Sequence, residues 1–440
     1  MLKRVNKQRQ IEGIPVRDAG FPSPFPGGLE YASPARGMWN IVHVGMLIPE
    51  AHEIFVCASC CLRGVVLTAA EMGASHRFST VEILEQNLLE GNMEELVIEG
   101  VCDIIEKLPK RPPAVLVYTS CVHHFAGCDL DLIYNTLRQR YPDIDFADCY
   151  MNPVMRKSGM TPDQLMRSRL YMPLHKRPVN PNAVAILGND LPTAPDSDLY
   201  ALLRANGRKI HEITACKTYE EYQQMAESAA YISWYPSAKI GAQMTATRLG
   251  GKHIHVPFSY NYDEIEKGTQ TVARELGLPV PDLTEKRKIC DEALNRLLQV
   301  VGNTPIAIDY TFCSRPLSLA RLLLDHGFRV ERVYLDAVTG EEKADLEYLK
   351  ANHPQLLLYP TVHAAMRFHS PKETSDFLAV GQKAAHFTNT THFVNVVEGG
   401  GMWGFQAVIE TARLMEEAHL EEKDLRKLIQ VKGMGCEGCL

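Results

Sequence analysis

Short apolar runs alternate with amphipathic helical patterns along this chain, most regularly between residues 183 and 260. Four runs in that stretch are rich in the β-branched and aromatic residues typical of strands: AVAILGND at 183–190, RKIHEITAC at 208–216, AYISWYP at 230–236 and HIHVPFSY at 253–260. Between them lie segments with helical spacing. Parallel strands need such a crossover helix to bring the chain back to its starting edge. The repeat therefore restricts the fold to a parallel sheet covered by helices.

The same alternation extends to both sides of that stretch. Upstream, the apolar run AVLVYTS at 114–120 precedes an amphipathic helix that Pro142 stops. Downstream, apolar runs at 305–311, 328–336 and 355–360 alternate with helical segments. The pattern predicts an α/β protein with three Rossmann-like domains, each a parallel sheet flanked by helices. We expect an extended N-terminal arm, three such domains, the second ending in a helical bridge, and a C-terminal tail, at 1–40, 41–177, 178–300, 301–420 and 421–440.

Composition excludes several classes of function. The 440 residues include 46 Lys plus Arg and 53 Asp plus Glu, a formal charge of −7 that argues against a nucleic-acid partner. No apolar run reaches the roughly 18–20 residues of a membrane helix, and no apolar stretch of a secretory signal follows the basic N-terminus. We therefore expect a cytoplasmic protein that does not enter a membrane. No strand leads into a glycine-rich dinucleotide-binding or P-loop motif, which disfavours those two enzyme classes.

The twelve cysteines are the strongest chemical signal. Cys57, Cys60 and Cys61 fall within five residues, a density that packing alone does not explain. Cys121 directly follows the apolar run at 114–120, and Cys128 comes seven residues later. Disulfides are rare in a reducing cytosol, and thiolates without nearby imidazoles favour an iron–sulfur cluster over catalytic zinc. Because open α/β sheets hold their sites beyond the carboxyl ends of strands, these thiols are expected to converge.

The other cysteines give weaker evidence of a function. Cys102 follows a helical apolar period and is expected in the core, and four isolated cysteines are expected to be ordinary thiols: Cys149, Cys216, Cys290 and Cys313. Cys436 and Cys439 form a CxxC pair on a Gly-rich tail. Metal scavenging, cluster delivery and no role are all open for this pair.

Three stretches resemble the nitrogenase component 1 family, which includes molybdenum–iron protein subunits, cofactor-assembly scaffolds and dark protochlorophyllide reductase subunits. IFVCASCCLRG resembles the family's apolar run that reaches a ligand cysteine at a helix start, with Cys61 the nearest match. AVLVYTSC followed by GCDLD resembles the second ligand segment, so that Cys121 matches a ligand and Cys128 an acidic position. MNPVMRKSGM resembles a third segment and aligns Ser158 with a serine near the cluster, although a surface serine is the alternative. The similarity extends from about Ser33 to His419.

The resemblance implies an iron–sulfur oxidoreductase component. The implied cofactor is a 4Fe–4S cluster or a larger cluster similar to the P-cluster, shared with a homologous subunit or a second copy of this chain. The candidate metal ligands are Cys57, Cys60, Cys61 and Cys121, with Cys128 as a further cofactor-binding candidate. An ATP-hydrolysing iron protein would supply electrons, and a substrate or a second metallocofactor would lie between the domains.

Two departures argue against dinitrogen reduction at a molybdenum cofactor. The family's usual first cluster cysteine should fall near 33–40, where there is none. Trp234 stands where the catalytic subunit of nitrogenase holds its cofactor through a cysteine. Electron transfer to another substrate, and a non-catalytic scaffold that assembles or transfers a metallocluster, therefore remain as competing functions. A plain α/β binding or metal-storage protein is a third.

Candidates for catalysis come from the third domain. His392 and Glu398 flank the Gly-rich turn at 399–401 and would line a pocket there. Arg315 follows the strand end TFCSRP, where it would bind an anionic substrate. Each has a structural alternative, as do His123 and His124 beside Cys121, which would otherwise tune the cluster or relay protons.

Overall fold

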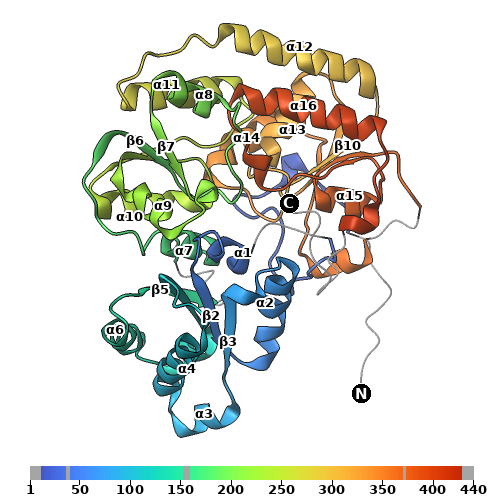
Figure 1. Cartoon of the computed structure of the whole chain (residues 1–440). Coiled ribbons are helices and arrows are strands. Elements are labelled where there is room, and N and C mark those ends of the chain that lie inside the picture. The colour runs from blue at the N-terminus through green and yellow to red at the C-terminus, as the bar shows by residue number, and fades with distance from the viewer. Residues whose placement is uncertain (1–10, 36–39, 152–158, 370–372, 429–440) are drawn as a thin grey trace, which may run out of the picture.

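The computed structural model describes residues 11–35, 40–151, 159–369 and 373–428. Its three sheets are flanked by helices, which confirms the predicted α/β class with three Rossmann-like domains (Figure 1). In this view the first domain lies at the bottom, and the second and third lie above it. Among the described residues, no helix is both long enough and apolar enough to cross a bilayer.

The first domain is a four-stranded parallel sheet in the order β3-β2-β4-β5. β2 and β4 are buried along their whole length, as expected for strands covered on both faces. The strands are β2 (His52–Cys57), β3 (Phe78–Glu82), β4 (Ala114–Ser120) and β5 (Asp145–Met151). The helices are α1 (Ile41–Gly45), α2 (Ser59–Glu71), α3 (Glu85–Glu90), α4 (Met93–Lys107), α5 (Cys121–Ala126), α6 (Leu130–Arg140) and α7 (Pro162–Arg169).

The second domain repeats this plan in the order β7-β6-β8-β9. Its strands are β6 (Asn180–Ile186), β7 (Lys209–Glu212), β8 (Ser228–Ser233) and β9 (Lys252–His255). Its helices are α8 (Asp198–Ala205), α9 (Tyr219–Gln224) and α10 (Lys239–Leu249), followed by the bridge helices α11 (Tyr262–Glu275) and α12 (Thr284–Val301). α7 of the first domain contacts both β5 and α10, and so joins the first domain to the second.

The third domain has a six-stranded sheet in the order β1-β12-β11-β10-β13-β14. Five strands are parallel: β10 (Ile306–Asp309), β11 (Val330–Tyr334), β12 (Leu357–Tyr359), β13 (Leu378–Val380) and β14 (Phe393–Val394). The sixth, β1 (Ile14–Pro15), comes from the N-terminal arm and pairs antiparallel with β12. Four helices belong to this domain: α13 (Pro316–Asp325), α14 (Lys343–Asn352), α15 (Gln382–Thr388) and α16 (Phe405–Leu420), which packs along α12.

In each sheet the first strand of the domain is central, and later strands add on both sides of it. The direction in which strands are added to the sheet therefore reverses between β2 and β4, between β6 and β8, and between β10 and β13, although all these strands are parallel. Such a reversal leaves a crevice at the carboxyl ends of the strands, because the crossover helices leave in opposite directions. These three crevices are where the fold can place ligands.

Candidate functional site

Cysteines from two distant stretches meet at the crevice of the first sheet. β2 and β4 are neighbours, with Val56 paired to Thr119, and neighbouring strands lie about 4.8 Å apart. Cys57 ends β2, and Cys121 begins α5 immediately after β4. The two residues therefore leave adjacent strands at the same edge, as the sequence predicts.

Cys60 and Cys61 complete this group from the first turn of α2, which begins directly after β2. Their Sγ atoms are 3.9 Å apart. Both are exposed, whereas Cys121 is half-buried and Cys57 is buried at the base of the group. We call these four residues the cysteine group.

The thiols of the cysteine group interact electrostatically. Burial raises the pKa of Cys57 to about 12, and the charges of Cys61, Cys60 and Cys121 add to the effect. The pKa of Cys61 is raised in the same way, first by burial and then by its contact with Cys60 and by Cys121. The sulfurs therefore lie close enough to oppose each other's ionisation, and a bound cation would relieve that repulsion.

The four side chains of the cysteine group are thiols, the ligand type of iron–sulfur clusters. In the described ranges, no three His, Cys, Asp or Glu side chains converge closely enough to hold one ion. A cluster distributes its thiolates over several irons, so its ligands lie farther apart and are all cysteines. With Cys60 and Cys61 exposed, a group bound here would also be open to a second chain.

The contacts of Cys128 are with other parts of the first domain and not with the cysteine group. It follows the C-terminal end of α5, packs against the core beneath α4 and α6, and donates its backbone N–H to the His123 carbonyl. Burial and the Glu94 carboxylate raise the pKa of its thiol. Cys102, Cys149, Cys290 and Cys313 are buried, and Cys216 is half-buried. Ser158, Cys436 and Cys439 lie outside the described residues.

The two histidines after Cys121 differ. His123 is buried, and its Nδ1 accepts the Ser120 backbone N–H at 3.1 Å, which caps the start of α5. Burial lowers its pKa, so the ring is neutral at neutral pH. His124 is exposed on the outer side of the short helix. The structure thus gives His123 a structural role beside the cysteine group.

A chamber of about 310 Å³ opens between the second and third domains. Its walls are the loops after β8, β10 and β11, all at carboxyl ends of strands, where this class of sheet binds ligands. The lining residues are Tyr235, Pro236, Ser237, Tyr310, Ser314, Pro316, Asp336, Ala337, Thr339 and Glu342. The polar groups of this lining are hydroxyls and carboxyls, and the carboxylates of Asp336 and Glu342 already accept hydrogen bonds from Thr361, Val362 and Leu317.

Tyr235 links this chamber to a buried charged group behind it. Its hydroxyl donates to Glu398 Oε2 at 2.6 Å, and the guanidinium carbon of Arg167 lies 4.4 Å from the centre of its ring. Arg167 in turn donates to both carboxylate oxygens of Asp190, at 2.7 and 2.8 Å, and to Asp163 at 2.9 Å. Residues from the first, second and third domains thus meet on one wall.

His392 and Glu398 are not brought together. His392 precedes β14, and its Nδ1 contacts the Ala418 carbonyl at the end of α16. Glu398 follows the opposite end of that strand, where the Gly-rich turn begins. Gly401 has φ +74°, and a Cβ there would lie 1.9 Å from the Pro192 carbonyl oxygen. The glycine run therefore lets the third domain approach the second, and Glu398 alone of the pair reaches the chamber wall.

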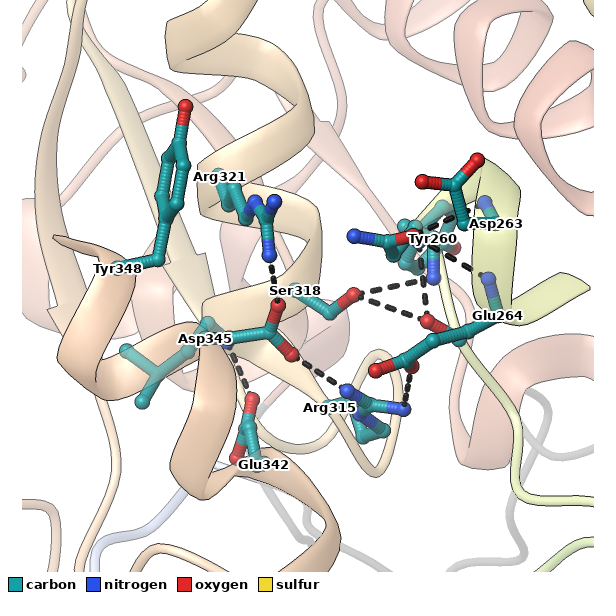
Figure 2. Close-up of polar contacts among 12 residues, drawn as sticks. Tyr260, Asp263, Glu264, Arg315, Ser318, Arg321, Glu342, Asp345 and Tyr348 are labelled. Atoms are coloured by element: carbon teal, nitrogen blue, oxygen red, sulfur yellow. Dashed lines mark hydrogen bonds and ion pairs between the residues drawn. The ribbon is translucent and has the colours of Figure 1, made fainter. Parts of the chain in front are cut away.

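Arg315 lies in a buried ion network rather than on the chamber surface. Figure 2 shows its guanidinium between Glu264 and Asp345, at 2.5 Å from each, and it also donates to the Phe258 carbonyl at 3.1 Å. Arg321 contacts the other Asp345 oxygen at 3.3 Å. These partners are all protein groups, so the expected role as an anion site receives no support from this geometry, and the network instead joins α11, α13 and α14.

The model of the nitrogenase component 1 type oxidoreductase family matches residues 42–402. This chain belongs to the nitrogenase component 1 family. Family members are oxidoreductases that generally bind iron–sulfur clusters and work as multimers with an iron protein. The match covers most of the chain, including the cysteine group, the chamber and every strand of the three sheets except β1.

Two solved structures support the same fold. "Nitrogenase Cp1 at pH 6.5" is 12% identical, with a TM-score of 0.65, and the match covers 90% of this chain and 94% of that chain. "Nitrogenase Cp1 at pH 5" is 13% identical, with a TM-score of 0.55, covering 90% and 89%. The comparison with curated proteins gives no match. At such identities the likeness shows the component 1 fold alone.

Sequence reasoning missed the chamber wall made by Tyr235 and Arg167. Tyr235 lies in AYISWYP, two residues past the end of β8, which is a position where sites occur in this fold. Its position just past the carboxyl end of a strand could have identified Tyr235 as a site residue. Arg167, from α7, carries no such signal, because only the packing of α7 against the second domain brings it there.

Proposed function

We propose that this chain is the subunit of a nitrogenase-like reductase that receives electrons at an iron–sulfur cluster and passes them to an organic substrate in the chamber. The single observation that supports it most is the meeting of Cys57, Cys60, Cys61 and Cys121 at one crevice. Thiolates are the ligands of such clusters, and four from one chain suffice when a partner supplies the rest. When bound, the cluster supplies single-electron transfer.

The chain's own residues perform the other tasks. Cys57 would hold the inner side of the cofactor, and the exposed Cys60 and Cys61 would face a homologous subunit or a second copy of this chain. An ATP-hydrolysing iron protein is the proposed electron donor. The chamber, lined by hydroxyl and carboxyl groups, would bind and orient the substrate away from bulk water.

The first experiment asks whether these thiols hold iron. Full-length protein is reconstituted anaerobically with iron and sulfide, and bound metal is measured together with the electron paramagnetic resonance spectrum. We expect Cys61→Ala and Cys121→Ala to lose iron and sulfide, whereas the matched control Cys216→Ala, a half-buried thiol of the second domain, retains both. Cys128→Ala tests the fifth candidate. Wild-type protein that takes up neither element would refute the proposal and leave a plain binding protein.

The second experiment separates the reductase from the scaffold, which is the alternative function. Reconstituted protein is mixed with an ATP-hydrolysing iron protein, and cluster reduction is followed with and without ATP. ATP-dependent reduction followed by consumption of an added organic acceptor supports the reductase. Transfer of iron and sulfide to an apo-acceptor protein, with no electron uptake, would support the scaffold instead.

A further inference from the structure

A chain of hydrogen bonds joins the second domain to the third beside the chamber. Ser233, the last residue of β8, is buried, and its Oγ lies 2.9 Å from both His253 Nε2 and His255 Nδ1 on the neighbouring strand β9. His255 Nε2 lies 2.7 Å from Glu341 Oε1 in the third domain. Glu341 belongs to the short turn Gly340–Glu342 that precedes α14. Both ends of this chain lie within two residues of groups that line the chamber.

The direction of each hydrogen bond follows from the outer end of the chain, on α10. The Thr247 hydroxyl donates to the Gln243 backbone carbonyl, which can only accept, so the hydroxyl oxygen accepts from the Gln243 amide nitrogen at 3.2 Å. The Gln243 amide oxygen therefore faces His253 Nδ1 at 3.0 Å and accepts its proton. Burial, and after it the charges of His255 and Lys239, lower the pKa of His253 to about 4. At neutral pH His253 thus carries a single ring proton, on Nδ1, and its Nε2 can only accept.

His255 is left with a contact that needs an extra proton. Because His253 Nε2 accepts, the Ser233 hydroxyl donates to it, and the Ser233 oxygen accepts the Nδ1 proton of His255. A neutral His255 with its proton on Nδ1 would point the Nε2 lone pair at Glu341 Oε1 across 2.7 Å. Two acceptors at that distance repel, so a proton lies between them, and imidazole is the more basic of the two groups. The side chains of His255 and Glu341 are 10% and 18% exposed, so little water screens the pair.

We propose that the His255 imidazolium and the Glu341 carboxylate form a clamp, which holds the turn of the third domain to β9 and so keeps one wall of the chamber in place. Glu341 Oε2 is buried and, within the described ranges, has no hydrogen-bond partner, so this carboxylate relies on His255 there. Loss of the shared proton would leave the carboxylate facing a lone pair, and the turn would separate from β9. The clamp therefore weakens as the pH rises. It depends on neither the cysteine group nor the reductase function, so its failure and theirs are separate.

Other ionisable groups lie around the clamp. Lys239 of α10 acts on His253, which gains a second ring proton only below about pH 4. Asp345, on the helix after the turn, is paired with Arg315. Burial raises the pKa of Glu342, which follows Glu341 in the turn, to about 8. A pH series on the clamp therefore needs a background without the Glu342 carboxyl.

The first test detects the ring protons directly. Full-length protein that is isotopically labelled in its histidine nitrogens gives ring N–H correlation spectra, which distinguish an imidazolium from each neutral tautomer. At neutral pH we expect His253 to carry its proton on Nδ1 and His255 to carry protons on both nitrogens. The variants His253→Gln and His255→Asn assign the two sets of signals. A His255 ring with a single proton at neutral pH overturns the clamp.

The variant Glu341→Gln gives a sharper comparison. An amide has nearly the shape of a carboxylate, and its N–H can donate to the Nε2 of a neutral His255. This variant therefore keeps the bridge and removes the need for the extra proton. We expect its His255 to be neutral at neutral pH, with the proton on Nδ1. An imidazolium that persists in Glu341→Gln would mean that Glu341 does not hold the proton, and the inference would be wrong.

Hydrogen exchange of residues 336–342 measures the effect on the chamber wall. In His255→Asn the shorter side chain does not reach Glu341, and exchange in this segment should accelerate by roughly 10-fold or more at neutral pH. The matched control is His175→Asn, because His175 Nε2 also lies 2.8 Å from a carboxylate, that of Asp145, but its side chain is 65% exposed. Exchange at 336–342 in this control should equal that of wild type. Equal exchange in the two variants would show that the clamp does not hold the wall.

The pH series uses Glu342→Gln as its background. Raising the pH from about 7 to about 9 should accelerate exchange at 336–342 after correction for the intrinsic exchange rate, because the imidazolium loses its proton. Adding Glu341→Gln to this background should remove that acceleration. Exchange that depends on pH equally with and without Glu341→Gln would contradict the clamp, whatever the result for iron binding or electron uptake.

Discussion

The raised pKa of Cys57 leads to a quantitative prediction about thiol labelling of the cluster-free protein. Its pKa is about 12 against an ordinary 9.0, which lowers the thiolate fraction about 1000-fold at neutral pH. A more basic thiolate is also more nucleophilic, with a Brønsted coefficient of about 0.4–0.5, so the reaction rate falls less than the thiolate fraction does. The net expectation for an aromatic disulfide reagent is a rate roughly 50-fold below that of a free thiol. Burial of the side chain slows it further.

The assay is time-resolved labelling followed by peptide mass spectrometry, in cluster-free and reconstituted protein. In the cluster-free form, we expect the exposed Cys60 and Cys61 to react early and Cys57 last. Reconstitution should protect Cys121 as well. Labelling of Cys57 at the rate of an exposed thiol, or labelling of Cys121 that reconstitution leaves unchanged, would refute the electrostatic reasoning.

Three further predictions concern stability. Arg315→Met removes the main partner of the buried Asp345 carboxylate and should lower the free energy of unfolding by about 3–5 kcal/mol in a denaturant titration. Arg287→Met breaks the half-exposed ion pair with Glu266 and should lower that free energy by about 1 kcal/mol or less. Equal losses in the two variants would contradict the argument from the buried network. Gly401→Ala forces Cβ against a backbone carbonyl of the second domain and should lower Tm more than Gly277→Ala, which has a similar φ in open space. Burial raises the pKa of Glu342 from 4.5 to about 8, so between these pH values the folded state holds a proton that the unfolded state has lost. The free energy of unfolding should therefore fall as the pH rises from 4.5 to about 8, and Glu342→Gln should flatten this decline.

The sequence predicts most of the fold because each strand and helix has its own local pattern. The run at 114–120 became the buried strand β4, and of the run at 183–190 the residues 183–186 form the buried end of β6, which begins earlier, at Asn180. The meeting of Cys57 and Cys121 also followed from sequence, since both lie just beyond strands and parallel strands share one carboxyl edge. Local pattern and sheet geometry were enough for these features.

Other features depended on contacts that no local pattern records. Arg315 has the position of an anion-binding residue, yet α11 and α14 supply its carboxylates from distant parts of the sequence. The chamber forms only where loops of two domains face each other. β1 was expected to be part of an extended arm, because two residues next to a Pro-rich segment show no strand periodicity. In each case the deciding partner lies far away in the chain.

β1 has a consequence for how this chain is made. Ile14 pairs with Leu358, so residues synthesised well before the third domain complete the border of its sheet. Until that border is filled, β12 presents unpaired backbone groups on which a strand from another molecule can dock. Nascent chains of this protein would therefore be vulnerable to association while the third domain is being made, and a chaperone that retains the segment around Ile14 until the third domain emerges would protect them.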